Sequence, residues 1–188
     1  MVGTIQKILL DMVEGEADAA AVAEVKRRAE VPVDRVFRLD TVYPDDEWQR
    51  LLAAACEVLQ VTREQAMEIY ARYFCEDATQ RWPTWFRMSR SSRQFLERQP
   101  TIHNCFATGV RDPEARKAVT DKFRVEKLDM EIVTHYRSPN QLCDLYEALA
   151  RWIIRYYGER ATIWQAQCTR RGDPECEIHV RWEPEEAE

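Results

Sequence analysis

Residues 123–143 read FRVEKLDMEIVTHYRSPNQLC, and this stretch decides the fold class. From Phe123 to His135, apolar and β-branched residues alternate with charged ones, which predicts β-strands. The stretch ends where a helical pattern begins, and we expect one long amphipathic helix over residues 142–157. Its apolar stripe contains Leu145, Leu149, Ile153 and Tyr156.

Two further strands are predicted after this helix, at Ala161–Gln167 and Glu177–Trp182. They flank the turn sequence RRGDPE, so they should pair as an antiparallel hairpin. The C-terminal half is therefore expected to contain an antiparallel sheet and one long helix.

The N-terminal half has helical periodicity instead. Asp45 can cap one helix, Thr62 with Gln65 resembles a capping box, and Ser91 or Ser92 can cap another. These patterns predict an α+β fold in which a helical N-terminal half packs on the C-terminal half. The helices are expected over the Ile5–Val13 stripe, Asp18–Ala29, Asp45–Leu59, Thr62–Phe74 and Ser91–Arg98, with a loop or extended segment over Val31–Tyr43.

The length and composition limit the classes of protein to consider. The chain has 188 residues, which suits a single domain over residues 1–182. We expect a helical subdomain over about residues 1–60, a remainder over 61–182 and a flexible tail over 183–188. The net charge of -6 argues against nucleic acid as a partner. No apolar run suits a membrane span and no signal-peptide pattern is present, so the expected location is cytoplasmic without membrane association.

Three residues are candidates for a binding site. His103 follows an amphipathic helix and could be an axial metal ligand, although a hydrogen-bonded structural role is the commoner alternative. Tyr136 and Ser138 share one face of a strand, where two hydroxyls could bind one carboxylate or phosphate. The alternative is a sheet surface on which both hydroxyls have cross-strand partners.

Three cysteines form a second candidate site. Cys143 begins the long helix, while Cys168 and Cys176 flank the hairpin turn, so their thiolates could converge on zinc. His179 could supply a fourth ligand, whereas Gln165 is a poor one. The alternatives are buried free thiols or a Cys168–Cys176 bridge. Because the chain has no glycine-rich phosphate loop, nucleophile elbow or HExxH motif, we do not expect an enzyme.

Four segments, in order, resemble one family. They are MVGTI at the N-terminus, DDEWQRLLAAACEVLQVTREQAMEIYARYF, FLERQPTIH and FRVEKLDMEIVTHYRS. Together they resemble the haem nitric oxide/oxygen binding (H-NOX) domain, as found in stand-alone bacterial proteins and in the sensor of soluble guanylate cyclase. The resemblance implies haem b between two halves of the fold, with His103 as the axial ligand. It also implies that Tyr136 and Ser138 bind the haem propionates, with Asn140 where the family has arginine.

The same resemblance implies which gas would bind. The family's distal pocket positions fall on Ile5, Leu9, Phe74, Leu145 and Leu149, all apolar, and Leu145 stands where oxygen-binding members have tyrosine. We therefore expect a sensor that binds nitric oxide and carbon monoxide without stable oxygen binding.

Signalling would follow from release of His103. The effector is expected to be a separate protein, such as a histidine kinase or a cyclic-di-nucleotide enzyme. Some bacterial members carry zinc on cysteines that match Cys143, Cys168 and Cys176, with Gln165 in place of their histidine. The alternative function is a haem-poor ligand-binding module, or a cysteine- or zinc-based redox sensor of the same fold.

Overall fold

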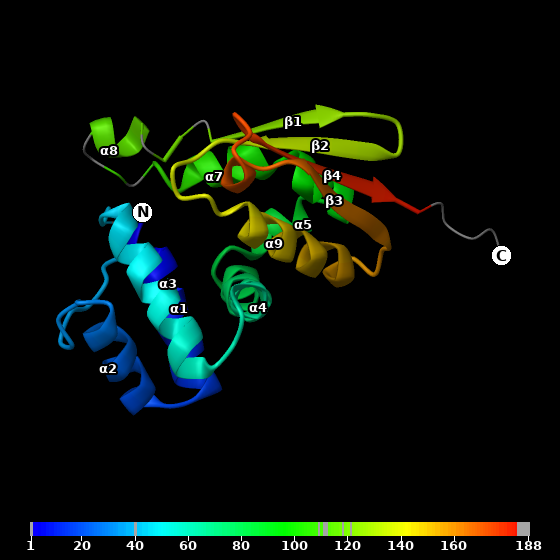
Figure 1. Cartoon of the computed structure of the whole chain (residues 1–188). Helices are drawn as coiled ribbons and strands as arrows, with labels where there is room; N and C mark the ends of the chain where they lie inside the picture. The colour runs from blue at the N-terminus through cyan, green and yellow to red at the C-terminus, as the bar shows by residue number, and fades with distance from the viewer. Residues whose placement is uncertain are drawn as a thin grey trace. The chain divides into compact units, whose positions relative to one another are not determined.

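Contacts within the chain group it into two units. The first comprises Met1–Phe74 with Phe106–Val119, and the second comprises Cys75–Cys105 with Thr120–Glu188. The computed structural model describes residues 2–39, 41–108, 110, 113–117, 119–120 and 122–183, without the side chain of residue 115. The expected flexible tail lies outside the described residues, apart from Glu183. The α+β fold class is confirmed, with helices in both units and an antiparallel sheet in the second (Figure 1).

The first unit is helical. Its helices are α1 (Gly3–Glu16), α2 (Ala19–Arg28), α3 (Asp45–Leu59), the first part of α4 (Arg63–Arg81) and α8 (Pro113–Lys117).

Local sequence signals explain several of these helix starts. The Asp18 side chain accepts a hydrogen bond from the Ala21 amide at 2.8 Å, and Thr62 and Gln65 form the expected capping box. The prediction that Asp45 caps α3 is wrong, because Pro44 is the N-cap and Asp45 begins the helix. At this first helical position, the negative charge of Asp45 interacts favourably with the positive end of the helix dipole.

The core of the first unit lies between α1, α3 and α4. Leu9, Trp48 and Leu51 are fully buried, and the Trp48 and Tyr70 rings meet edge to face at 5.5 Å. Gly3 allows a close approach at the start of α1, since a Cβ atom there would lie 2.1 Å from the Arg38 carbonyl oxygen.

The second unit contains short helices and a sheet. The helices are α5 (Pro83–Arg87), α6 (Ser92–Glu97), α7 (Gln99–Cys105), α9 (Cys143–Tyr156) and the 3₁₀ helix η1 (Thr169–Arg171). The strands are β1 (Phe123–Lys127), β2 (Glu131–Tyr136), β3 (Ala161–Gln167) and β4 (Cys176–Trp182). In the described residues they form a four-stranded antiparallel sheet in the order β1-β2-β4-β3.

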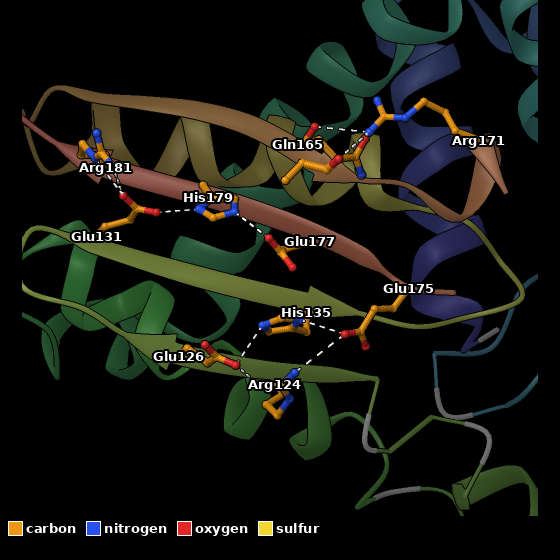
Figure 2. Close-up of polar contacts among 11 residues, drawn as sticks. Arg124, Glu126, Glu131, His135, Gln165, Arg171, Glu175, Glu177, His179 and Arg181 are labelled. Carbon is orange, nitrogen blue, oxygen red and sulfur yellow. Dashed lines mark hydrogen bonds and ion pairs between the residues drawn. The ribbon is translucent and has the colours of Figure 1, made fainter. Parts of the chain in front are cut away.

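The two faces of this sheet differ in chemistry. Directly paired residues share a face, so Thr134 and its partner Ile178 lie on the apolar face that α9 covers (Figure 1). The opposite face carries charged side chains, among them Glu131, His179 and Arg181, which Figure 2 shows bonded in a row. In the part of the chain that the structure describes, no helix combines the length and apolarity needed to cross a membrane.

Candidate functional site

His103 lies within α7, in the second unit. The sequence predicts a helix end or loop here, but Pro100 takes the second position of α7, where proline is tolerated, and the helix continues through His103. Burial lowers the pKa of His103 to about 4, and the nearby charge of Lys122 adds to this effect. The imidazole is therefore neutral at neutral pH, which is the form that binds a metal ion.

The Phe123 ring contacts both His103 and Tyr136, one of the two hydroxyl residues predicted to bind an anion. Its ring centroid lies 4.9 Å from that of His103 and 4.8 Å from that of Tyr136. The sequence does not mark Phe123 as a site residue. Its position is revealed by the β1–β2 pairing, in which Phe123 is the direct cross-strand partner of Tyr136.

The structure brings Tyr136, Ser138 and Asn140 together, and all three are buried. The Tyr136 and Ser138 side chains are hydrogen-bonded, and the Asn140 amide donates to Ser138 Oγ at 3.3 Å. The Leu142 amide donates to Tyr136 Oη at 3.4 Å. Burial raises the pKa of Tyr136 to about 12, so its hydroxyl stays protonated and can donate to an anion.

The predicted distal residues belong to both units. Ile5, Leu9 and Phe74 lie in the first, while Leu145 and Leu149 lie on α9 of the second.

Two tyrosine hydroxyls near these positions in the sequence are already engaged. Tyr70 donates to the Ile5 carbonyl at 3.1 Å, and its ring stacks on Phe74 at 6.2 Å. Tyr146, which follows Leu145, shares a buried hydrogen bond of 2.6 Å with Thr134 on the apolar face of the sheet.

The three cysteines do converge. Cys143, Cys168 and Cys176 are buried free thiols whose Sγ atoms all lie within 4.8 Å of one another. Cys143 and Cys168 are separated by 3.7 Å between Sγ atoms. Two thiolates at about 2.3 Å from one tetrahedral ion would have a similar separation, so the spacing suits a thiophilic metal.

The thiols differ in their electrostatic surroundings. Burial raises the pKa of Cys143 to about 12. Burial also opposes ionisation of Cys168, but hydrogen bonds from the backbone and side chain of Arg170 outweigh it, and the pKa of Cys168 is lowered. The Thr169 amide donates to Cys176 Sγ at 3.3 Å. Donors to sulfur of this kind stabilise a thiolate.

His179 does not join the cysteines, which corrects the expected fourth ligand. It lies on the opposite face of β4 from Cys176 because the two positions differ by an odd number of residues. Its ring nitrogens bond Glu131 at 2.5 Å and Glu177 at 2.9 Å (Figure 2). The His179 ring also stacks on Trp164.

A haem group fits the residues around Phe123. Haem iron can be held by a neutral imidazole, which His103 could supply, and haem propionates accept hydrogen bonds, which Tyr136, Ser138 and Asn140 could donate. The comparison with known families agrees, since a family model described as Haem-NO-binding matches residues 2–165. The chain belongs to the haem-NO-binding family.

Domains of this family are sensors rather than catalysts, and membership supports a haem-based gas sensor that signals to a partner effector. No curated protein matches the chain. The fold is similar to that of an H-NOX protein from S. oneidensis in the Fe(II)NO ligation state, with a TM-score of 0.84 and 17% identity over 98% of this chain and 100% of that chain.

An oxygen-binding H-NOX domain related to soluble guanylate cyclases is also similar, with a TM-score of 0.77 and 15% identity over 98% of this chain and 96% of that chain. Because relatives with bound nitric oxide and with bound oxygen share this fold, the fold does not decide which gas binds. Side chains of the individual protein must decide it.

Proposed function

We propose that this chain is a haem-based sensor that binds nitric oxide and carbon monoxide and does not retain oxygen. The observation that supports it most is the arrangement around Phe123, whose ring contacts both the neutral, half-buried imidazole of His103 and the ring of buried Tyr136, which is hydrogen-bonded to Ser138. A purely structural histidine would not require the second group.

Each residue has a distinct role in this proposal. His103 would hold the iron through one ring nitrogen, and its helix α7 would fix the orientation of the imidazole. Tyr136 and Ser138 would donate hydrogen bonds to the propionates, and Asn140 would add neutral donors without charge. Haem, when bound, supplies the ferrous iron at which the gas binds.

Gas selectivity would come from the distal residues. A bound oxygen molecule carries partial negative charge and is retained by a hydrogen-bond donor, whereas nitric oxide and carbon monoxide need none. Ile5, Leu9, Phe74, Leu145 and Leu149 offer no side-chain donor. The Tyr70 hydroxyl donates to the Ile5 carbonyl, and the Tyr146 hydroxyl is hydrogen-bonded to Thr134 Oγ1.

Signalling would begin at His103. Release of its imidazole from the axial position would free α7, whose His103 ring packs against Phe123 of β1. A shift between two conformations of these elements would then be read by a separate effector, such as a histidine kinase or a cyclic-di-nucleotide enzyme.

Haem reconstitution of His103→Ala tests the axial role. The wild-type protein should give a Soret band whose position reports imidazole ligation, and the variant should lose that position and regain it with added imidazole. His135→Ala serves as the matched control, because His135 bonds Glu175 on the charged face of the sheet. An unchanged Soret band in His103→Ala would exclude the proposal.

The variant Leu145→Tyr tests whether the lack of a hydrogen-bond donor at position 145 prevents oxygen binding. The ferrous wild-type protein should form no stable complex in air, whereas this variant should bind oxygen through the new hydroxyl. Leu145→Phe has nearly the same size without a donor and should behave like the wild type. Oxygen binding by the wild type, or equal behaviour of both variants, would contradict the role assigned to the apolar distal residues.

The converging thiols support a second function, a zinc or redox site at Cys143, Cys168 and Cys176. Gln165 lies on the same face of the sheet as Cys176, since its cross-strand partner is Ile178. Gln165→His should therefore add a fourth ligand and raise zinc affinity by at least about tenfold, measured by competition with a chromophoric chelator.

The exposed Cys105 supplies a control, because Cys105→Ser should leave zinc affinity unchanged. If the purified wild type holds no zinc and Gln165→His gains none, the metal site is wrong. Mass spectrometry of the oxidised protein then decides on a redox role, which requires a disulfide between two of these three cysteines.

A further inference from the structure

A group of large apolar side chains lies where α5 meets the end of α9 in the second unit. The Trp82 and Trp85 rings stack at 4.7 Å, and the Phe86 ring lies 5.2 Å from Tyr156. Tyr156 in turn stacks on Trp152 at 5.3 Å. We call this group the aromatic patch; with Met88 it comprises Trp82, Trp85, Phe86, Met88, Trp152 and Tyr156.

Much of the aromatic patch is open to solvent. Met88 is 63% exposed and Tyr156 is 49% exposed, while Trp82, Trp85 and Trp152 are half-buried. Clusters of exposed apolar side chains on a soluble domain mark interaction sites. Tryptophan, tyrosine, methionine and arginine are also the residue types enriched at the centres of protein interfaces.

Internal hydrogen bonds hold the patch in place. The Arg98 guanidinium donates to the Trp85 carbonyl at 3.2 Å and to Ser89 Oγ at 2.9 Å, and it lies 3.6 Å from Met88 Sδ. The Tyr157 hydroxyl donates to the Phe86 carbonyl at 2.8 Å. A partner would therefore meet an ordered surface, and less conformational entropy would be lost on binding.

Two arginines lie near a patch residue in the sequence, although the whole chain carries a net charge of -6. Arg87 and Arg90 flank Met88 in the sequence and are exposed. Neither guanidinium forms an ion pair with a residue that the structure describes. Exposed arginines elsewhere, such as Arg27 and Arg124, pair with nearby carboxylates.

We propose that the aromatic patch docks an acidic amphipathic segment of a partner protein. Apolar side chains of that segment would pack against Trp85, Met88 and Tyr156, and its carboxylates would pair with Arg87 and Arg90. A second copy of this chain joined through the same patch is disfavoured, because it would place these arginines against each other. The inference does not depend on haem binding.

Two synthetic peptides test the proposal. Both carry the same leucine and phenylalanine face in a helical pattern, one with glutamate and the other with lysine at the remaining positions. Binding is measured by the tryptophan fluorescence of the full chain, since Trp82, Trp85 and Trp152 lie in the patch. We expect the glutamate peptide to bind and the lysine peptide not to bind, with affinity falling as salt is added.

Substitutions in the chain assign the binding to the patch. The double variant Arg87→Gln/Arg90→Gln should weaken binding of the glutamate peptide by about tenfold. Met88→Ala/Tyr156→Ala should also weaken it, and both positions are exposed enough for the fold to persist. The control Arg27→Gln/Arg124→Gln removes the same charge from other exposed sites and should change affinity less than twofold.

Four results would overturn the proposal. They are equal binding of the two peptides, equal affinity of the Arg87→Gln/Arg90→Gln variant and the wild type, tighter binding of phosphatidylserine vesicles or of a single-stranded oligonucleotide through the same arginines, and self-association of the chain that Tyr156→Ala abolishes. The last two would assign the patch to a membrane, a nucleic acid or a second copy.

Discussion

At position 140 a buried asparagine stands where the resemblance to the family leads us to expect arginine. Asn140 lies beside Ser138 and can donate hydrogen bonds, but it brings no charge to a propionate. Arg at this position would form a bidentate charged contact, so Asn140→Arg should slow haem dissociation by about tenfold. Transfer of haem to apomyoglobin measures the rate.

The control for this prediction is Asn140→Gln, which lengthens the side chain without adding charge and should not slow the loss of haem. Unchanged or faster dissociation from Asn140→Arg would mean that other residues hold the propionates.

Gln6, on α1, is a polar residue in the core of the first unit. It is fully buried, and among the residues that the structure describes neither its Oε1 nor its Nε2 has a hydrogen-bond partner. An unpaired buried amide costs about 1–3 kcal/mol, so Gln6→Met, similar in size and without polar hydrogens, should raise the free energy of unfolding by about 1–2 kcal/mol. Urea denaturation measures this difference.

Gln80→Met is the matched control, because Gln80 is exposed and its replacement should change stability by less than about 0.5 kcal/mol. Lower stability of Gln6→Met than of the wild type would contradict the cost assigned to the unpaired amide.

At the residue scale, the sequence identifies side chains by their chemistry but not by their neighbours. His103, Tyr136 and Ser138 were named as candidates for their imidazole and hydroxyl groups and for the resemblance to the family, and their roles toward haem stay predictions. Phe123 could not be named in this way, because a phenylalanine on a strand is usually a core residue, and its role depends on the distances to His103 and Tyr136.

The strands β2 and β4 share an ion pair that should depend on pH. Burial opposes the charge of His179, but hydrogen bonds to Glu131 and Glu177 outweigh it and raise the pKa of His179 above 6.5. The hydrogen bond from His179 and the bonds from Arg181 lower the pKa of Glu131 below 4.5.

The signs of these shifts define a pH window. The stability from His179 is present below pH 6.5 and is lost as the pH rises through its folded pKa. The stability from Glu131 is present above pH 4.5 and is lost as the pH falls through its folded pKa. His179→Gln should therefore cost about 0.5–1 kcal/mol between these limits and less at higher pH.

Urea denaturation at a series of pH values checks this prediction. Glu131→Gln removes the other partner and should remove the same pH-dependent contribution. A stability difference between the wild type and His179→Gln that does not vary with pH would show that the ion pair contributes nothing.

The ends of helices were predicted well where a capping motif marks them and less well where no such motif is present. The capping box at Thr62 located the start of α4, but its end was expected at Phe74 and the helix continues to Arg81. Residues 75–81 have no long apolar stripe that would mark them as helical. They are nevertheless compatible with a helix, and the first proline after Phe74 is Pro83.

At the scale of the whole molecule, the sequence indicated helices first and strands later, and this order is confirmed. It did not indicate that Phe106–Val119 returns to the first unit. That return depends on a small cluster of Val2, Ala107 and Val119, with Phe106 packed against it. Isolated apolar residues so far apart carry no periodic signal, so only the folded structure reveals their contact.

This return of the chain constrains how the protein is made. A ribosome that has released residues 1–74 has not yet supplied the last segment of the first unit, which arrives only with residue 119. Residues 75–105 of the second unit emerge in between, before the strands that they accompany. Both units therefore remain incomplete at the same time while the chain is being made. Because neither unit is one continuous segment, neither could be transferred to another gene as a single insert.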